Sequence, residues 1–332
     1  MDEQEEQFVE EIEDPTREAH WGKIWFSMYL NTLSVFGLVL VFNGTYLLTT
    51  FFSLFLISLG LLGVTAGAHR LWAHRSYQAT TILRLFLMFC QTLAGQGCIY
   101  DWVRYHRLHH KCFGTSLDPY NPSKGFFYSQ FVCAVQKTTP EQEKVANTID
   151  MSDLQNDPIV MFQKKYYNIM YIIFVLIMPV YIPWVYWNET FVRAAIVSGW
   201  MRCAIVLHLS RLIHSATTIL GLKRGERYPL DTNLVYIINK TYWLQYHYLA
   251  PWDYQTSEYG HYGNDFVSTF IRVCAALEIA TNLRTIDGKG VRDALYNSLV
   301  SKKDISECLS DIDSSIPMDH YLRPQTYKIL FD

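Results

Sequence analysis

Two groups of histidines stand close together beside arginines and tryptophans. His69 and His74 form the first group, and His106, His109 and His110 form the second, so together they hold five of the chain's eleven histidines. The second group has the spacing i, i+3, i+4, which on a helix places all three side chains on one face. The five-residue spacing of the first group suits a helix end or a turn. Imidazole is a good ligand for iron, zinc, copper and nickel, so the pattern predicts a metal site without naming the metal.

The cysteines do not add to this site. The chain has no CxxC pair and no HExxH sequence, which argues against the common zinc patterns. Its seven cysteines are scattered and odd in number, so they predict no disulfide framework and fit a reducing compartment. A single histidine is usually a core or surface residue, but two compact groups favour metal binding.

The composition is that of a membrane protein. Half of the 332 residues are hydrophobic and only 18% are charged, which is apolar for a soluble protein of this length. The net charge of −3 gives no electrostatic basis for binding nucleic acid. The partner that this composition indicates is membrane lipid.

A long uncharged stretch predicts the first pair of membrane spans. No charged residue occurs from Ile24 to Ala68, which is too long for one span and long enough for two. Asn43, Gly44 and Thr45 supply turn chemistry near the middle. We expect a helical hairpin with spans near 24–42 and 46–66.

A second hairpin is expected further along, with spans near 166–188 and 191–213. Arg193, Arg202 and Arg211 fall inside the fourth span, and an arginine in the middle of a span should face protein or a polar cavity. The stretch 80–100 is apolar but interrupted by Arg84. We expect it to form a helix in the membrane interface or beneath the cap, not a further span.

Basic residues flank the first hairpin at both ends. Arg17 and Lys23 precede it, and Arg70 and Arg75 follow it, so both ends and both chain termini are expected in the cytosol. The predicted fold is an all-α integral membrane protein in which four transmembrane helices lie under a helical cytosolic cap. The membrane domain spans 16–300, and its cap comprises 67–165 and 222–300. An acidic, disordered tail at 1–15 and a C-terminal tail at 301–332 flank it.

Several longer motifs carry a family resemblance. The chain resembles the membrane acyl-CoA desaturases of the stearoyl-CoA, or delta-9, type found in animals and especially insects. The matching segments are GVTAGAHRLWAHRSYQA at 63–79, WVRYHRLHHK at 102–111, DPYNPSKGFF at 118–127, DMSDLQNDPIVMFQKKYY at 150–167 and APWDYQTSEYG at 250–260. The resemblance implies an endoplasmic reticulum enzyme of unsaturated fatty acid synthesis. It would use two histidine-bound irons, O2 and electrons from cytochrome b5 to remove two hydrogens from an acyl-CoA.

The resemblance also implies nine histidine ligands, which this chain keeps only in part. Three positions are changed: the histidine after the fourth span is Thr218, and the third histidine box, LQYHY at 244–248, has Leu244 and Tyr248 at two ligand positions. Leucine cannot bind iron, threonine binds it poorly, and tyrosine binds it as phenolate. His214, which stands where the family has an asparagine, lies one helical turn before Thr218 and is a candidate substitute ligand. The implied histidines that remain are His69, His74, His106, His109, His110 and His247.

Three functions stay open on these residues. The chain is an active desaturase with an unusual iron site, or a desaturase-fold protein that binds acyl-CoA or pairs with an active desaturase without redox catalysis, or a related oxidative enzyme such as a hydroxylase. Stoichiometric iron distinguishes the first from the second, because desaturation needs it and a binding or partner role does not. A site with only some of its histidines could take either iron or zinc. By resemblance, acyl-CoA would be bound by Gln96, Arg104 and Lys137.

Overall fold

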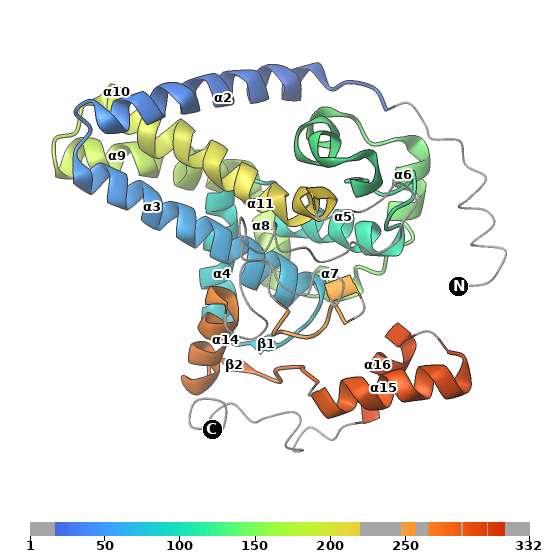
Figure 1. Ribbon diagram of the computed structural model, residues 1–332. Coiled ribbons are helices and arrows are strands. Elements are labelled where there is room, and N and C mark those ends of the chain that lie inside the picture. The colour runs from blue at the N-terminus through green and yellow to red at the C-terminus, as the bar shows by residue number, and fades with distance from the viewer. Residues whose placement is uncertain are drawn as a thin grey trace.

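The computed structural model describes residues 17–219, 247–248, 250–256, 265–286, 288–303 and 305–315. Within them the chain is mostly helical, and the helices of two hairpins lie side by side next to a cap of shorter helices (Figure 1). The histidine-bearing helix α5 lies in this cap. The predicted tail at 1–15 and the part of the predicted cap from 222 to 246, which includes Leu244, lie outside the described residues.

Four helical segments are long and apolar enough to cross a membrane, which confirms the predicted number of spans. They run over Trp21–Phe42, Leu47–Ala73, Pro158–Tyr186 and Phe191–Ser215. Their parts are α2 (Trp21–Phe42), α3 (Leu47–Leu62), η1 (Gly63–Ala73), α8 (Pro158–Tyr171), η5 (Ile172–Ile177), α9 (Met178–Tyr186), α10 (Phe191–Arg193), η6 (Ala194–Met201) and α11 (Arg202–Ile219).

The second and third segments are longer than the predicted spans. The helix that begins with α3 continues through η1 to Ala73, past the predicted end at 66. The helix that begins with α8 starts at Pro158, where the side chain of Asp157 accepts hydrogen bonds from the first backbone amides. Both extensions carry polar residues into the cap, so hydropathy alone could not place these helix ends.

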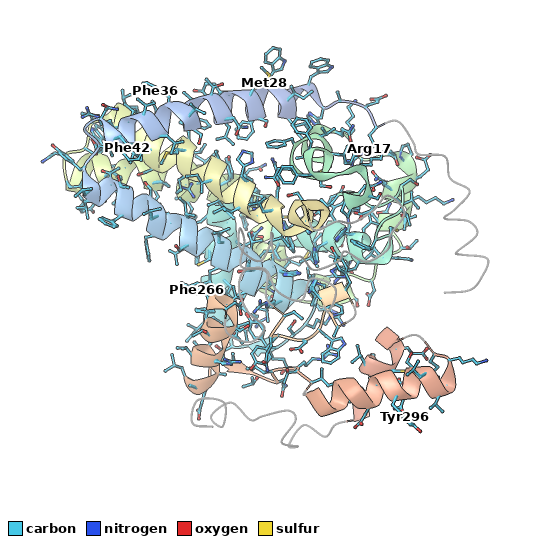
Figure 2. All side chains as sticks on the ribbon, viewed as in Figure 1. Arg17, Met28, Phe36, Phe42, Phe266 and Tyr296 are labelled. Carbon is cyan, nitrogen blue, oxygen red and sulfur yellow. The ribbon has the colours of Figure 1, made fainter. Side chains whose placement is uncertain are left out.

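The outer face of the first span is apolar. Met28, Phe36 and Phe42 lie on α2, away from the other membrane-spanning helices (Figure 2). Their exposed fractions are 56%, 48% and 85%. On the inner side Gly37 lets α2 approach η6, because a Cβ there would lie 2.9 Å from the Cβ of Met201. A helix with this distribution suits contact with lipid on one side and with protein on the other.

The arginine in the middle of the fourth span is buried in protein, as the sequence predicts. Arg202 is fully buried, and its guanidinium donates hydrogen bonds to the backbone carbonyls of Leu93, Val175 and Ser198. Carbonyl dipoles thus replace water around the charge, which makes its position inside the bundle tolerable.

The stretch 80–100 forms a bent pair of helices. Helix α4 covers Thr81–Ala94 and helix α5 covers Ile99–Lys111, with an 80° bend between them. Gly95 and Gly97 make the turn with φ values of +70° and +91°, a region that favours glycine. The bend directs α5 and its histidines under the end of the second span.

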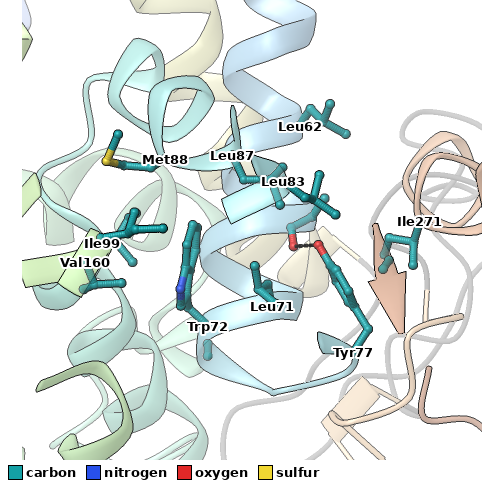
Figure 3. Packing of buried hydrophobic residues seen from close by; sticks show 14 of the residues in the cluster. Leu62, Leu71, Trp72, Tyr77, Leu83, Leu87, Met88, Ile99, Val160 and Ile271 are labelled. Atoms are coloured by element: carbon teal, nitrogen blue, oxygen red, sulfur yellow. Dashed lines mark hydrogen bonds between the residues drawn. The ribbon is translucent and has the colours of Figure 1, made fainter. Parts of the chain in front are cut away.

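The main core lies where the second span, α4 and α5 meet. Trp72, Leu87 and Ile99 are buried there, and the hydroxyl of Tyr77 donates a 2.9 Å hydrogen bond to the Ala66 carbonyl (Figure 3). The remaining described elements cover this core or extend from it: η2 (Pro122–Lys124), η3 (Tyr128–Val132), η4 (Cys133–Val135), α6 (Pro140–Ala146), α7 (Ser152–Gln155), α14 (Phe266–Ala276), α15 (Gly288–Ser301) and α16 (Ile305–Ser315). Strands β1 (Gln78–Ala79) and β2 (Ala280–Thr281) pair antiparallel, and α16 lies within the predicted C-terminal tail.

Candidate metal centre

The first and second histidine groups meet His247 in one cluster. One ring nitrogen each from His69, His74, His106, His110 and His247 lies within 4.8 Å of all the others. His69 and His74 lie at the end of the second span, and His106 and His110 lie on α5. The first pair is aligned by the π-helical winding of η1, in which the backbone N–H of His74 donates to the carbonyl of His69 at 3.0 Å. A spacing of five residues is one turn of such a helix.

The spacing of these nitrogens suits one bound metal ion. The Nε2 atoms are 2.9 Å apart for His74 and His106, 3.2 Å for His69 and His247, and 3.2 Å for His247 and His110. Metal–imidazole bonds of about 2.0–2.1 Å at right angles would place neighbouring nitrogens about 2.9 Å apart. These three separations are close to those of neighbouring ligands on a single ion, and all five donors lie within 4.8 Å of one another.

Burial keeps the cluster in the form that binds metals. Desolvation lowers the pKa values of His74, His106 and His110 well below the usual histidine value, and the neighbouring imidazoles lower these pKa values further. The pKa of His247 is lowered well below the usual value by the same causes in the same order. At neutral pH these rings are uncharged and carry a lone pair for a metal.

His109 belongs to a different set of contacts. Its Nδ1 lies 2.8 Å from the carboxylate of Asp118, and both side chains are buried. A carboxylate only accepts, so Nδ1 donates, and in the neutral ring Nε2 is then the acceptor for the phenol of Tyr248, 3.1 Å away. The contact with Asp118 is the usual support of a metal-binding histidine. The nitrogen that would face a metal, however, meets the tyrosine that replaces a histidine.

His214 lies on the same side as His109. The centres of their rings are 5.0 Å apart, and the His214 ring stacks on Tyr120 at 4.1 Å with an 8° angle between the planes. His214 is buried but is not one of the five clustered donors. Thr218 lies one turn further along α11, and its side chain is outside the described residues.

The residues predicted to bind acyl-CoA each have a protein partner. Gln96 lines a cavity beneath the metal centre, and its Oε1 accepts from the indole of Trp102 at 3.1 Å. Arg104 is paired with Glu143 at 2.7 Å on the cap, and Lys137 is paired with Glu18 at 2.9 Å on the surface.

Sequence reasoning missed Asp118 and Tyr120 as neighbours of the histidines. Both lie in the segment 118–127, which contributes to the family resemblance but which gave neither residue a role. Asp118 accepts from the backbone amide of Tyr120 at 2.9 Å, and this turn presents its carboxylate to His109. A carboxylate nine residues after a histidine at a helix end is a weak signal, because the intervening turn decides whether they meet.

A buried arginine fixes the segment that follows His247. Arg70 stands beside His69, and its guanidinium donates to the backbone carbonyls of Tyr254 and Thr256 and pairs with Asp265 at 3.1 Å. Both charged side chains are almost completely buried. This contact joins the first histidine group to the part of the chain that supplies the fifth donor of the cluster.

We expect Arg70→Met to destabilise the fold strongly. The substitution leaves Asp265 buried without its partner, which costs about 3–5 kcal/mol. Arg75→Met is the matched control, because Arg75 is 54% exposed in its 2.8 Å pair with Asp153 and such a pair contributes about 0–1 kcal/mol. Thermal denaturation in detergent measures both, and equal shifts in the two variants would contradict the assigned role of Arg70.

The comparisons with known proteins give one consistent group. No protein-family model matches the chain. The acyl-CoA Delta-9 desaturase of Acheta domesticus is 38% identical over 274 residues, which cover 81% of this chain and 76% of that protein. The stearoyl-CoA desaturase of Homo sapiens is 35% identical over 276 residues, covering 82% and 76% respectively. The chain belongs to the acyl-CoA desaturase family.

Family membership does not decide regiochemistry here. The acyl-CoA Delta-12 desaturase of Tribolium castaneum is 35% identical over 278 residues, covering 81% of this chain and 78% of that protein, close to the values for the relatives named above. Within the described residues of this desaturase-family chain, five of the implied ligands lie in one cluster, while Tyr248, one of the three replacements, lies on the side of His109.

Proposed function

We propose that this chain is a desaturase-family membrane protein that binds a fatty acyl ligand and one metal ion, and that it does not carry out desaturation. The five-histidine cluster carries the proposal, since its nitrogens have the spacing of ligands to one ion. His69, His74, His106, His110 and His247 would hold that ion. Around His109, the nitrogen available for a second ion is instead hydrogen-bonded to Tyr248.

The loss of one iron matters because of the electron balance. Removing two hydrogens from an acyl chain is a two-electron oxidation, which the family resemblance assigns to a pair of irons. A metal bound to the histidine cluster would supply Lewis acidity and, if it is iron, one change of oxidation state. The protein's own contribution at the cluster is to bury and orient five neutral imidazoles. At His109 it is to hold the ring between a carboxylate and a phenol.

We further propose that the cap and both termini face the cytosol at the endoplasmic reticulum membrane. The N-terminal segment supports this, because Ala19 pairs with Gln136 and the amide of Lys137 donates to the Glu18 carbonyl at 2.8 Å. The start of the first span therefore lies beside the cap that carries the histidines. Cytochrome b5, acyl-CoA and another desaturase chain are the partners that this position would suit.

One observation favours the second candidate, an active desaturase with a reworked second site. His214 and Tyr248 both lie next to His109, with ring centres 5.0 Å and 5.8 Å from its own. An imidazole and a phenolate beside His109 would give three donors for a second iron.

Metal content per polypeptide separates the two candidates. The chain is expressed with iron supplied and purified in detergent, and we expect about one metal ion per chain and no unsaturated product when acyl-CoA, cytochrome b5 and its reductase are added. Human stearoyl-CoA desaturase, prepared in parallel, is the positive control. Two irons per chain together with an unsaturated product would replace the proposal with the second candidate.

A further inference from the structure

A cavity of about 360 Å³ lies between the start of α2, the end of α11 and the bend between α4 and α5. This volume is at the small end of the range for ligand pockets. Phe26, Leu30, Trp102 and Leu207 give it apolar walls. The exposed residue Lys23 also lines it, which places one end of the cavity at the surface of the molecule.

The cavity contains a hydrogen-bond donor without an acceptor. The indole N–H of Trp102 can only donate, so the Gln96 atom that it contacts must be the amide oxygen. The Gln96 amide nitrogen, which is a donor, is buried and has no hydrogen-bond partner in the described part of the chain. A buried donor left in this state costs free energy unless a ligand or water accepts from it.

Two cations line the same cavity without a counter-charge. Arg211, which is half-buried, and Lys23 have side chains that make no hydrogen bond or ion pair with any described residue. None of the described lining residues is acidic. His208 does not change this balance, because its two ring nitrogens face Asn31 and Gln130. The cavity therefore has an excess of positive charge and of donors, beside apolar walls.

We propose that this cavity binds the carboxylate of a free fatty acid, with Arg211 and Gln96 as the head-group contacts and the apolar walls around the first part of the tail. A carboxylate offers only acceptors, which matches a guanidinium, an amide N–H and an ammonium. A thioester brings a neutral carbonyl to the same place and leaves Arg211 without a counter-charge. The inference rests on the proposed function only in that both require a fatty ligand.

The test compares ligands with one tail and different heads. Full-length protein in lipid nanodiscs is titrated with tritiated dodecanoate, dodecanol, dodecyl phosphate and dodecanoyl-CoA. We expect dodecanoate to bind most tightly. Arg211→Gln should weaken dodecanoate binding by about 10-fold to 100-fold, the range for a hydrogen bond to a charged group, and should leave dodecanol binding unchanged. Arg193→Gln is the matched control and should change neither, because Arg193 is a partly buried arginine near the other end of the fourth span and does not line the cavity.

Each outcome has a separate meaning. Equal affinity for dodecanoate and dodecanol, or unchanged dodecanoate binding in Arg211→Gln, would overturn the carboxylate site. Tighter binding of dodecyl phosphate would assign the cavity to a phosphate head instead and overturn it as well. If dodecanoyl-CoA binds most tightly while dodecanoate does not bind, the carboxylate inference fails but the proposed acyl-ligand function stands. Size-exclusion chromatography of Arg211→Gln confirms that a lost affinity is not a lost fold.

Discussion

Purified His110→Gln should contain almost no metal, whereas His109→Gln should keep about one ion per chain. The two residues are neighbours on α5, so the variants change the same helix in the same way. His110 contributes to the five-donor cluster, in which its Nε2 lies 3.2 Å from that of His247. His109 faces Asp118 and Tyr248 instead. Removing a direct ligand should lower the metal affinity by more than the roughly 10-fold to 100-fold that follows from removing a contact that only supports a ligand.

Metal analysis of the folded fraction provides the measurement. His109→Gln leaves the buried Asp118 without its present partner, so its stability is expected to fall even though its metal content does not. Denaturation with and without a chelator keeps the two effects apart, since a bound metal stabilises only the chain that binds it. A chelator should lower the melting temperature of the wild type and of His109→Gln, and should not affect His110→Gln. Loss of metal from both variants alike would show that His109 belongs to the same site.

Much of the fold could be predicted from the order of apolar and charged residues. The uncharged stretch from Ile24 to Ala68 specifies a hairpin because no other common structure hides so long an apolar run. Its second helix ends later than expected because η1 is fully buried by protein, so its polar residues do not need to be in water. The buried Arg202 is likewise tolerated away from water, because backbone carbonyls accept hydrogen bonds from its guanidinium.

The division of the histidines could not be predicted from spacing alone. Successive helical residues differ in direction by about 100°, so His109 and His110 point to different sides even though both fall within the broad face that includes His106. Which side becomes a metal cluster depends on η1, the segment 118–120 and His247, which lie far apart in the chain. The unpaired donors around Arg211 and Gln96 likewise arise from the meeting of four helices and leave no local sequence pattern.

The triple variant Thr218→His, Leu244→His and Tyr248→His should raise the metal content from about one ion per chain to about two. Within the described residues, Tyr248 is the replaced position that can be placed, and its hydroxyl lies 3.1 Å from the Nε2 of His109. An imidazole at position 248 would remove the hydrogen bond between the phenol and His109. It would leave two imidazoles, that of His109 and the new one, as donors for a metal. The other two substitutions follow from the histidine-box resemblance, with Leu244 and the side chain of Thr218 outside the described residues.

Two control variants show whether the second ion requires the added imidazole ligands or only the removal of the Tyr248 hydroxyl. Tyr248→Phe removes the phenol from His109 without adding a donor, so it should still contain about one ion, because phenylalanine cannot bind a metal. Tyr248→His alone should give an intermediate and weakly bound second ion, since His109 lies beside position 248 and His214 lies beside His109. If the triple variant folds and still holds one ion, the replaced positions do not complete a second site, and the assignment of the missing iron to the side of His109 is wrong. If it holds two, the substitutions that separate this chain from a two-iron desaturase have been reversed, and unsaturated product from acyl-CoA should appear with cytochrome b5.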